Sequence, residues 1–180
     1  MLRISGGIYR SRRIETPEQG TIPTKNRVRE AMMNALQNDL PNAEVLDLFA
    51  GSGALGIEGL SRGAKVAYFC DQAPMAQRIL PQNLTSLKAT NAVLLRSDAL
   101  SALKKLAEEK KSFDVIFLDP PYAMHELYIE SVRLITELGL LKPNGALVVE
   151  FEGDRPSEYS EYSQQRMYNY GRTHVLLLRK

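Results

Sequence analysis

Apolar runs and amphipathic stretches alternate along the chain from residue 44 to residue 151. Most of the apolar segments are continuous runs, a pattern typical of parallel strands that helices cover on both faces. The predicted strands are residues 44–49, 65–70, 91–96, 113–118 and 146–151, and the predicted helices are residues 54–62, 75–87, 99–110 and 127–138. This alternation predicts an α/β fold with a doubly wound, mostly parallel sheet.

The two ends of the chain depart from this alternation. The first fourteen residues mix β-formers with a pair of glycines and predict a short, irregular hairpin. A helix capped by Thr24 is expected next, since apolar residues recur at helical spacing at Val28, Ala31, Met32, Ala35 and Leu36. Two β-like runs, 166–170 and 173–179, predict a closing hairpin that adds an antiparallel strand to the sheet, and residues 153–165 predict a surface loop.

Composition narrows the class of protein without naming a function. The chain has 180 residues, of which 44% are apolar and 24% are charged. That length is enough for one core, so we expect a single domain over residues 1–180. Cys70 is the only cysteine, which excludes an intrachain disulfide and a cysteine-based zinc site and predicts a buried thiol. No apolar stretch has the length of a signal peptide or a membrane span, so we expect a cytoplasmic protein. We also expect it to be a monomer and to hold no metal.

The net charge of +2 hides an uneven distribution. Residues 1–30 carry seven lysines and arginines against three acids, a local charge of +4, so the other 150 residues sum to −2. Positive charge concentrated at one end predicts contact with a polyanion, because phosphates attract lysine and arginine whatever the sequence. We define residues 1–23 as the N-terminal basic segment, for which a solvated tail is the alternative interpretation.

A glycine-rich turn follows the first predicted strand. Gly51, Gly53 and Gly56 satisfy G-x-G-x-x-G between a strand and a helix, and Asp71 lies 20 residues beyond Gly51. The glycines allow close approach of the backbone to a ligand, and the acid can accept hydrogen bonds from two ribose hydroxyls. Both functions are needed to bind NAD and to bind S-adenosylmethionine, so this motif alone does not identify the cofactor.

Three further features favour S-adenosylmethionine. Asp47 precedes the glycines, where a carboxylate would repel a pyrophosphate but suit a cationic amino-acid group. Asp98 follows the third strand, where it can cap a helix, accept from an adenine amino group, or do both. A dehydrogenase would also need a substrate domain, for which 180 residues leave little room.

The strongest motif is Asp119-Pro120-Pro121-Tyr122, after the fourth predicted strand. Two prolines stiffen the exit from the sheet and leave the carbonyl of Pro120 available as an acceptor. Asp119 is a second acceptor, and Tyr122 offers a face on which a base can stack. Holding both hydrogens of an exocyclic amine aims the nitrogen lone pair at a methyl carbon, so in-line methyl transfer is expected.

These motifs and others spread over the chain resemble the RsmD family of 16S rRNA guanine-N2 methyltransferases. The resemblance rests on residues 3–14, 23–31, 46–56 and 60–64, on Asp119 to Tyr122, and on the closing Tyr170 and Gly171. It implies a Rossmann-like seven-stranded methyltransferase fold and a substrate guanine in the small ribosomal subunit, by the family's pattern guanine-966. The chain departs from the family pattern at Ile22, Lys25, Asn26 and Ala73.

The predicted site follows from the motifs and the resemblance together. The catalytic residues are predicted to be Asp119, Pro120, Pro121 and Tyr122. The residues expected to bind S-adenosylmethionine are Asp47, Phe49, Ala50, Gly51, Gly53, Asp71, Gln72, Asp98 and Ala99. The residues expected to lie near RNA are Arg3, Arg10, Arg12, Arg13, Thr24 and Arg27.

We therefore predict a methyltransferase that acts on a guanine N2 of 16S rRNA. Two alternatives stay open at this point. The same motif could serve adenine N6 in DNA or RNA, since any aromatic amine presents two N–H groups. A cofactor-binding or RNA-binding module that assists ribosome assembly without turnover is the other alternative.

Overall fold

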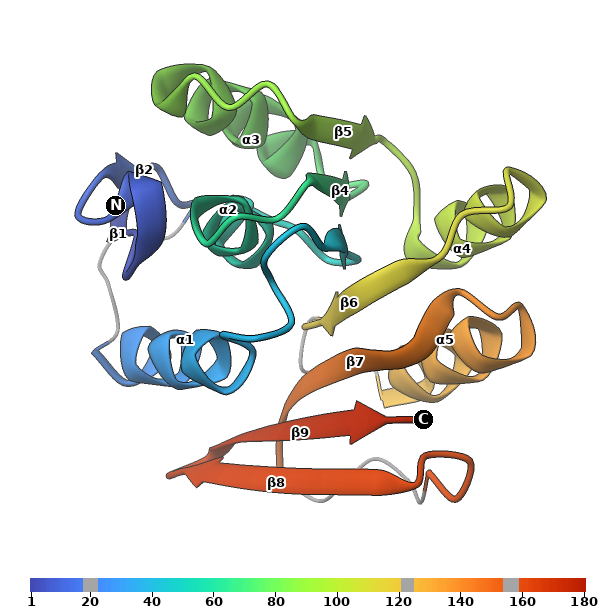
Figure 1. Cartoon of the computed structure of the whole chain (residues 1–180). Coiled ribbons are helices and arrows are strands. Elements are labelled where there is room, and N and C mark those ends of the chain that lie inside the picture. Colours follow the sequence, from blue (N-terminus) through green and yellow to red (C-terminus); the bar gives the residue numbers. More distant parts are fainter. Residues whose placement is uncertain (18–22, 121–124, 154–158) are drawn as a thin grey trace.

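A computed structural model describes residues 1–17, 23–120, 125–153 and 159–180. Its centre is a seven-stranded sheet in the order β5-β4-β3-β6-β7-β9-β8 (Figure 1). Strands β3 to β7 are parallel, and β9 joins them antiparallel to β7 and β8. The strands are β3 (Glu44–Asp47), β4 (Val66–Cys70), β5 (Ala92–Leu95), β6 (Phe113–Leu118), β7 (Leu141–Glu152), β8 (Gln164–Tyr170) and β9 (Thr173–Arg179). The predicted α/β class and the antiparallel closing hairpin are confirmed.

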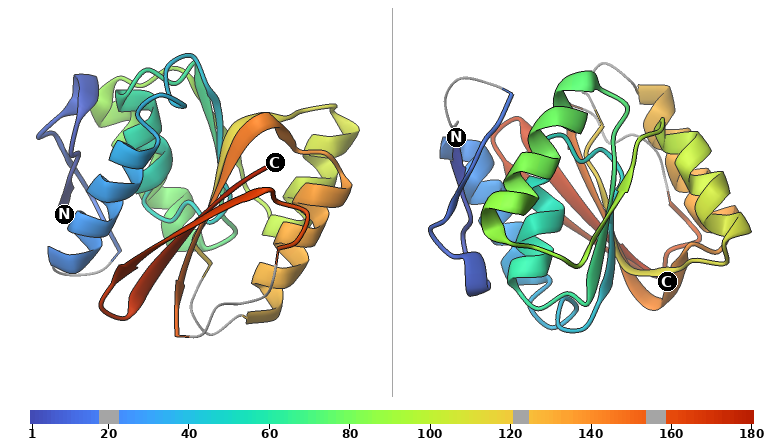
Figure 2. Two further views of the ribbon diagram at one scale, coloured as in Figure 1. Left: turned by 60° about the horizontal axis from the view of Figure 1, so that its bottom comes forward. Right: turned by 90° about the horizontal axis from the view of Figure 1, so that it is seen from above.

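Helices cover both faces of the sheet, as its apolar strands require. Figure 2 shows one layer of α1, α2 and α3 and, across the sheet, a second layer of α4 and α5. Alternate residues of a strand serve the two layers: Val45 packs in the first core and Leu46 in the second. The helices are α1 (Pro23–Ala35), α2 (Ala54–Ser61), α3 (Pro74–Leu87), α4 (Ala99–Glu108) and α5 (His125–Glu137).

The N-terminal basic segment folds against the first helical layer. Strands β1 (Leu2–Arg3) and β2 (Arg13–Ile14) pair antiparallel around a 3-10 turn at Gly7–Tyr9. Ile4 and Ile14 are each only 1% exposed and belong to the core of that layer. The predicted irregular hairpin is confirmed, and its described residues are packed on the protein rather than extended as a tail.

The starts of one strand and one helix differ from those expected. Strand β7 begins at Leu141, before the predicted residue 146, because Asn144 adopts a positive φ of 63° and a register shift against β6 lets pairing continue past Pro143. Helix α1 begins at Pro23, so Thr24 lies in its first turn and not at its cap.

The stretch from residue 153 to residue 165 is not wholly a surface loop. Tyr159 and Tyr162 are buried, 3% and 2% exposed, and their rings meet edge to face at 6.4 Å. The Tyr162 hydroxyl lies 3.0 Å from the hydroxyl of Thr136 on α5. Polar composition suggested a loop, but the two aromatic rings anchor this stretch to the second core. In the part of the chain that the structure describes, no helix has the length and apolarity needed to cross a membrane.

Candidate active site

The predicted cofactor residues meet at the carboxyl ends of β3 and β4, beside the point where the strand order reverses. The glycine loop (residues 48–53) runs from β3 to α2. Asp71, directly after β4, accepts the Gly51 N–H at 2.8 Å with one oxygen and the Ala73 N–H at 2.8 Å with the other. The two motifs that the sequence separates by 20 residues are therefore in direct contact.

The loop glycines have different physical reasons to be glycine. Gly51 has a φ of +52°, and a side chain placed there would meet nothing within 4 Å, so this backbone faces open space. At Gly53 a Cβ would lie 2.3 Å from Leu80, and at Gly56 it would lie 2.3 Å from the ring of Phe69. Gly53 and Gly56 thus let α2 pack closely, while Gly51 leaves its backbone accessible to a ligand.

Asp47 supports the loop from beneath. Its side chain is buried, and Oδ2 accepts the Gly56 N–H in the first turn of α2 at 2.9 Å. Burial, opposed by this hydrogen bond and reinforced by the nearby charge of Asp71, raises the pKa of Asp47 from 3.8 to about 7. Near neutral pH the protein therefore holds a carboxylate whose charge a bound cation would stabilise.

The raised pKa of Asp47 predicts a pH-dependent stability. A group with a raised folded pKa stabilises the fold below its unfolded pKa of 3.8, and that stabilisation is lost as pH rises towards 7. Between about pH 5 and pH 8 this loss is about 3 kcal/mol. Asp47→Asn keeps an acceptor for Gly56 and should flatten the profile, as urea unfolding across this range would measure. Parallel profiles for the two proteins would contradict the buried carboxylate.

A third carboxylate joins this edge of the sheet. Asp98 caps α4 by accepting the Ser101 N–H at 2.9 Å, which together with the Ser101 hydroxyl lowers its pKa. Between the three acids lies Cys70, whose pKa rises to about 12 through burial and the charges of Asp71, Asp98 and Asp47. The buried thiol that the sequence predicted is confirmed, and its high pKa makes it a poor nucleophile.

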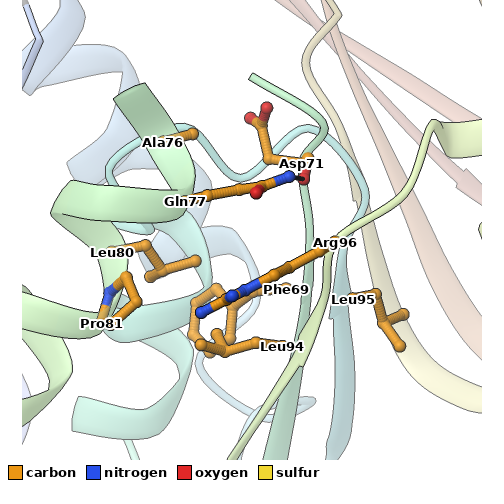
Figure 3. Close-up of a pocket in the computed structure, with 9 residues that line it drawn as sticks. All are labelled: Phe69, Asp71, Ala76, Gln77, Leu80, Pro81, Leu94, Leu95 and Arg96. Atoms are coloured by element: carbon orange, nitrogen blue, oxygen red, sulfur yellow. Dashed lines mark hydrogen bonds between the residues drawn. The ribbon is translucent and has the colours of Figure 1, made fainter. Parts of the chain in front are cut away.

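A recess lies beside Asp71, between α3 and strands β4 and β5 (Figure 3). Phe69, Leu80 and Leu94 form its apolar side, and the exposed Arg96 spans it. The Gln77 amide donates to the backbone carbonyl of Asp71 at 3.3 Å. Sequence reasoning missed Gln77 and Arg96 because neither belongs to a motif. The remaining predicted cofactor residues lie around this edge. Phe49, the buried Ala50 and Gly53 belong to the glycine loop, Gln72 is exposed after β4, and Ala99 is the first residue of α4.

The predicted catalytic motif begins at the end of β6. Asp119 is half-buried and Pro120 is buried, whereas Pro121 and Tyr122 lie outside the described residues. Across from Asp119, the Tyr128 hydroxyl of α5 donates to the carbonyl of Glu150 on β7. Burial, followed by the charge of Asp119, raises the pKa of Tyr128 well above its usual range. Tyr128 is therefore a neutral hydroxyl that is held against β7.

The predicted RNA residues fall into two groups. Arg10, Arg12 and Arg13 are exposed at the hairpin, where Arg12 donates to the Ser86 carbonyl near the end of α3 at 2.8 Å. Because α3 starts at the cofactor edge, the contact between Arg12 and Ser86 lies roughly 18 Å from that edge along the helix. Arg27 is exposed in the second turn of α1. The side chain of Thr24 lies outside the described part of the chain.

Two more of the seven lysines and arginines in residues 1–30 make contacts within the protein. They are Arg29 and Arg3, of which Arg3 is also a predicted RNA residue. Arg29 is 5% exposed and pairs with the buried Glu58 at 3.1 Å, so it contributes no charge to the surface. Arg3 is exposed, with its guanidinium 3.4 Å from the carbonyl of Ser11. Among the described residues, no group of three or more His, Cys, Asp or Glu side chains is arranged to hold a metal ion.

The comparisons with known proteins agree with this geometry. The structure matches RsmC of Thermus thermophilus, a 16S rRNA methyltransferase solved with AdoMet, with a TM-score of 0.72 over 91% of this chain and 44% of that one, at 22% identity. The two proteins therefore share their fold.

The family assignment is more specific. The family model described as Conserved hypothetical protein 95 matches residues 2–179. Ribosomal RNA small subunit methyltransferase D of Haemophilus influenzae is 37% identical over 86% of this chain and 81% of its own length. The yhhF protein of Escherichia coli superposes with a TM-score of 0.88 at 34% identity, covering 99% of this chain and 98% of that one. The chain belongs to this family, the RsmD family.

Proposed function

We propose that the protein transfers a methyl group from S-adenosylmethionine to the exocyclic N2 of a guanine in small-subunit ribosomal RNA. The observation that carries this proposal is the junction at the carboxyl edge, where Gly51 and Asp71 meet beside the open backbone of the glycine loop. Relatives named ribosomal RNA small subunit methyltransferase D support the substrate class.

The residues at this edge fit the cofactor. Asp71 has the acceptors for ribose hydroxyls, and the carboxyl groups of Asp47 and Asp71, both hydrogen-bonded to the backbone around the glycine loop, complement a cationic ligand next to Gly51. Asp98, exposed at the start of α4, is placed to accept from an adenine amino group while it caps the helix. When bound, S-adenosylmethionine supplies the electrophilic methyl carbon.

The chain's own residues act on the base. Asp119 and the carbonyl of Pro120 accept the two hydrogens of the guanine amine, and Tyr122 stacks on the ring. This arrangement orients the nitrogen lone pair and stabilises the positive charge that develops on nitrogen as the methyl group transfers. The proton that leaves the amine passes to Asp119 or to water.

We further propose a single methyltransferase domain with the N-terminal basic segment as its RNA contact. We also propose that the protein works as a cytoplasmic monomer. The reaction requires no metal, because positioning of the base and the charge of Asp119 supply the catalysis.

The direct test is transfer of a labelled methyl group from S-adenosylmethionine to small ribosomal subunits, naked 16S rRNA and duplex DNA, in parallel reactions. We expect label on small-subunit RNA. Label on DNA alone would overturn the substrate, and bound cofactor with no label on any substrate would favour a module without turnover.

The exposed arginines of the hairpin provide a test of RNA binding. The Arg10→Ala, Arg13→Ala double variant should lower affinity for RNA and reduce the salt slope by about 2, because two phosphate contacts are lost. Affinity for S-adenosylmethionine should not change. The matched control is Lys104→Ala with Lys105→Ala on α4, which removes the same charge from the opposite layer. Filter binding across a salt series measures both, and equal slopes for the two double variants would contradict an RNA role for the hairpin.

A further inference from the structure

Asn83 is a buried polar residue that the proposed function has not used. It lies on α3 among Leu80, Leu84 and Leu87, on the face that packs into the first core, and it is 2% exposed. A carboxamide in this position is costly unless its hydrogen bonds are filled.

The hydrogen bonds of Asn83 reach two separate segments. Its Oδ1 accepts the Glu15 N–H at 2.8 Å, and its Nδ2 donates to the Glu15 carbonyl at 2.9 Å. The same Nδ2 donates to the carbonyl of Ser52 at 2.9 Å. Both amide hydrogens are therefore in use, and the carboxamide pairs with Glu15 as a neighbouring strand would.

Asn83 joins the glycine loop, which is proposed to bind S-adenosylmethionine, to the N-terminal basic segment, which is proposed to bind RNA. Ser52 stands between Gly51, whose N–H contacts Asp71, and Gly53, which packs on Leu80. Glu15 follows β2 in the N-terminal basic segment, directly after Ile14. A displacement of either backbone must therefore strain or break a hydrogen bond to the same side chain.

We propose that Asn83 is a positioning residue that fixes the glycine loop to the N-terminal basic segment and thereby couples cofactor binding to RNA binding. The coupling rests on the proposed function, whereas the positioning does not. RNA bound to the segment and S-adenosylmethionine bound to the loop both act on backbone that Asn83 holds, so a backbone position that favours one ligand is transmitted to the site of the other. By linkage, the effect on the two affinities is the same factor.

The first experiment requires no RNA. Isothermal titration of S-adenosylmethionine into Asn83→Ala, well below its unfolding midpoint, should give a Kd about tenfold above wild type, because the loop loses its tether. Gln82→Ala is the matched control, because Gln82 is an exposed polar residue next to Asn83 on α3. Asn83→Ser replaces the alanine variant if that variant does not fold. A lowered melting temperature with an unchanged Kd would reduce Asn83 to a structural role and overturn the positioning.

The second experiment measures the coupling. The Kd for S-adenosylmethionine is determined without and with saturating small ribosomal subunits. In wild type the Kd without small subunits, divided by the Kd with them, should exceed about 3. In Asn83→Ala this ratio should fall to about 1. An equal ratio in both proteins would overturn the coupling. If wild type binds no RNA, the proposed function fails and the coupling fails with it, while the first experiment still decides whether Asn83 positions the loop.

Discussion

Asp119→Ala should slow methyl transfer strongly while the protein still binds S-adenosylmethionine. In the proposed reaction Asp119 accepts a hydrogen of the target amine and balances the charge that forms on nitrogen. Such a contribution typically accounts for 10²–10³ in rate, so single-turnover transfer should slow by at least about 100-fold. The Kd for the cofactor, by titration calorimetry, should change less than about threefold.

Two control variants isolate the charge of Asp119. Asp119→Asn keeps an acceptor oxygen without the charge and should retain more activity than the alanine variant. Glu109→Ala removes an exposed acid beyond the end of α4 and should transfer at the wild-type rate. Transfer by Asp119→Ala within tenfold of wild type would show that the motif does not act on the amine.

Glu58→Gln should produce the largest loss of stability of any single charge removal. Glu58 is 0% exposed on α2, and its two oxygens bind Arg29 at 3.1 Å and Ser5 at 2.7 and 2.9 Å, with Arg62 at 3.6 Å. Removal of its charge leaves Arg29 buried without a counterion, which typically costs 3–5 kcal/mol, so the free energy of unfolding should fall by about 4 kcal/mol.

Urea unfolding measures this loss, and an exposed ion pair serves as its control. Glu130→Gln removes a carboxylate that contacts Arg133 at the surface of α5, and its stability should equal that of wild type. Because Glu58 holds the N-terminal basic segment and α1 against α2, proteolysis of residues 1–17 should also accelerate in Glu58→Gln. Equal unfolding curves for Glu58→Gln and wild type would show that this network does not hold the segment.

The sheet and its edge were predictable because they follow from local pattern. Apolar runs predict the strands. Because the carboxyl ends of parallel strands lie at the same edge of a sheet, the sequence also predicts that Asp47, Asp71 and Asp98 lie at one edge. The start of β7 was missed because Pro143 normally ends a strand, and only the left-handed backbone of Asn144 with the register shift beside it allows pairing to continue.

The polar network behind the site could not be predicted from spacing. Asn83 bonds to Glu15 across 68 residues, and Glu58 bonds to Ser5 across 53. The available signal was a polar residue on an apolar face: Asn83 interrupts a leucine stripe, and Glu58 is the one charge in the sequence of α2. That signal marks a buried polar group without naming its partner. Arg29 shows the converse, because a charge count cannot separate a buried ion pair from a surface cation.

The identity of the methylated nucleoside tests the central claim most directly. Small ribosomal subunits that lack the modification are incubated with labelled S-adenosylmethionine, and their RNA is digested to nucleosides and separated by liquid chromatography with mass detection. We expect all label in N2-methylguanosine, at one methyl group per subunit, and none with Asp119→Ala. Label in N6-methyladenosine would contradict the assignment of the base, and incorporation that is the same with Asp119→Ala would contradict the site.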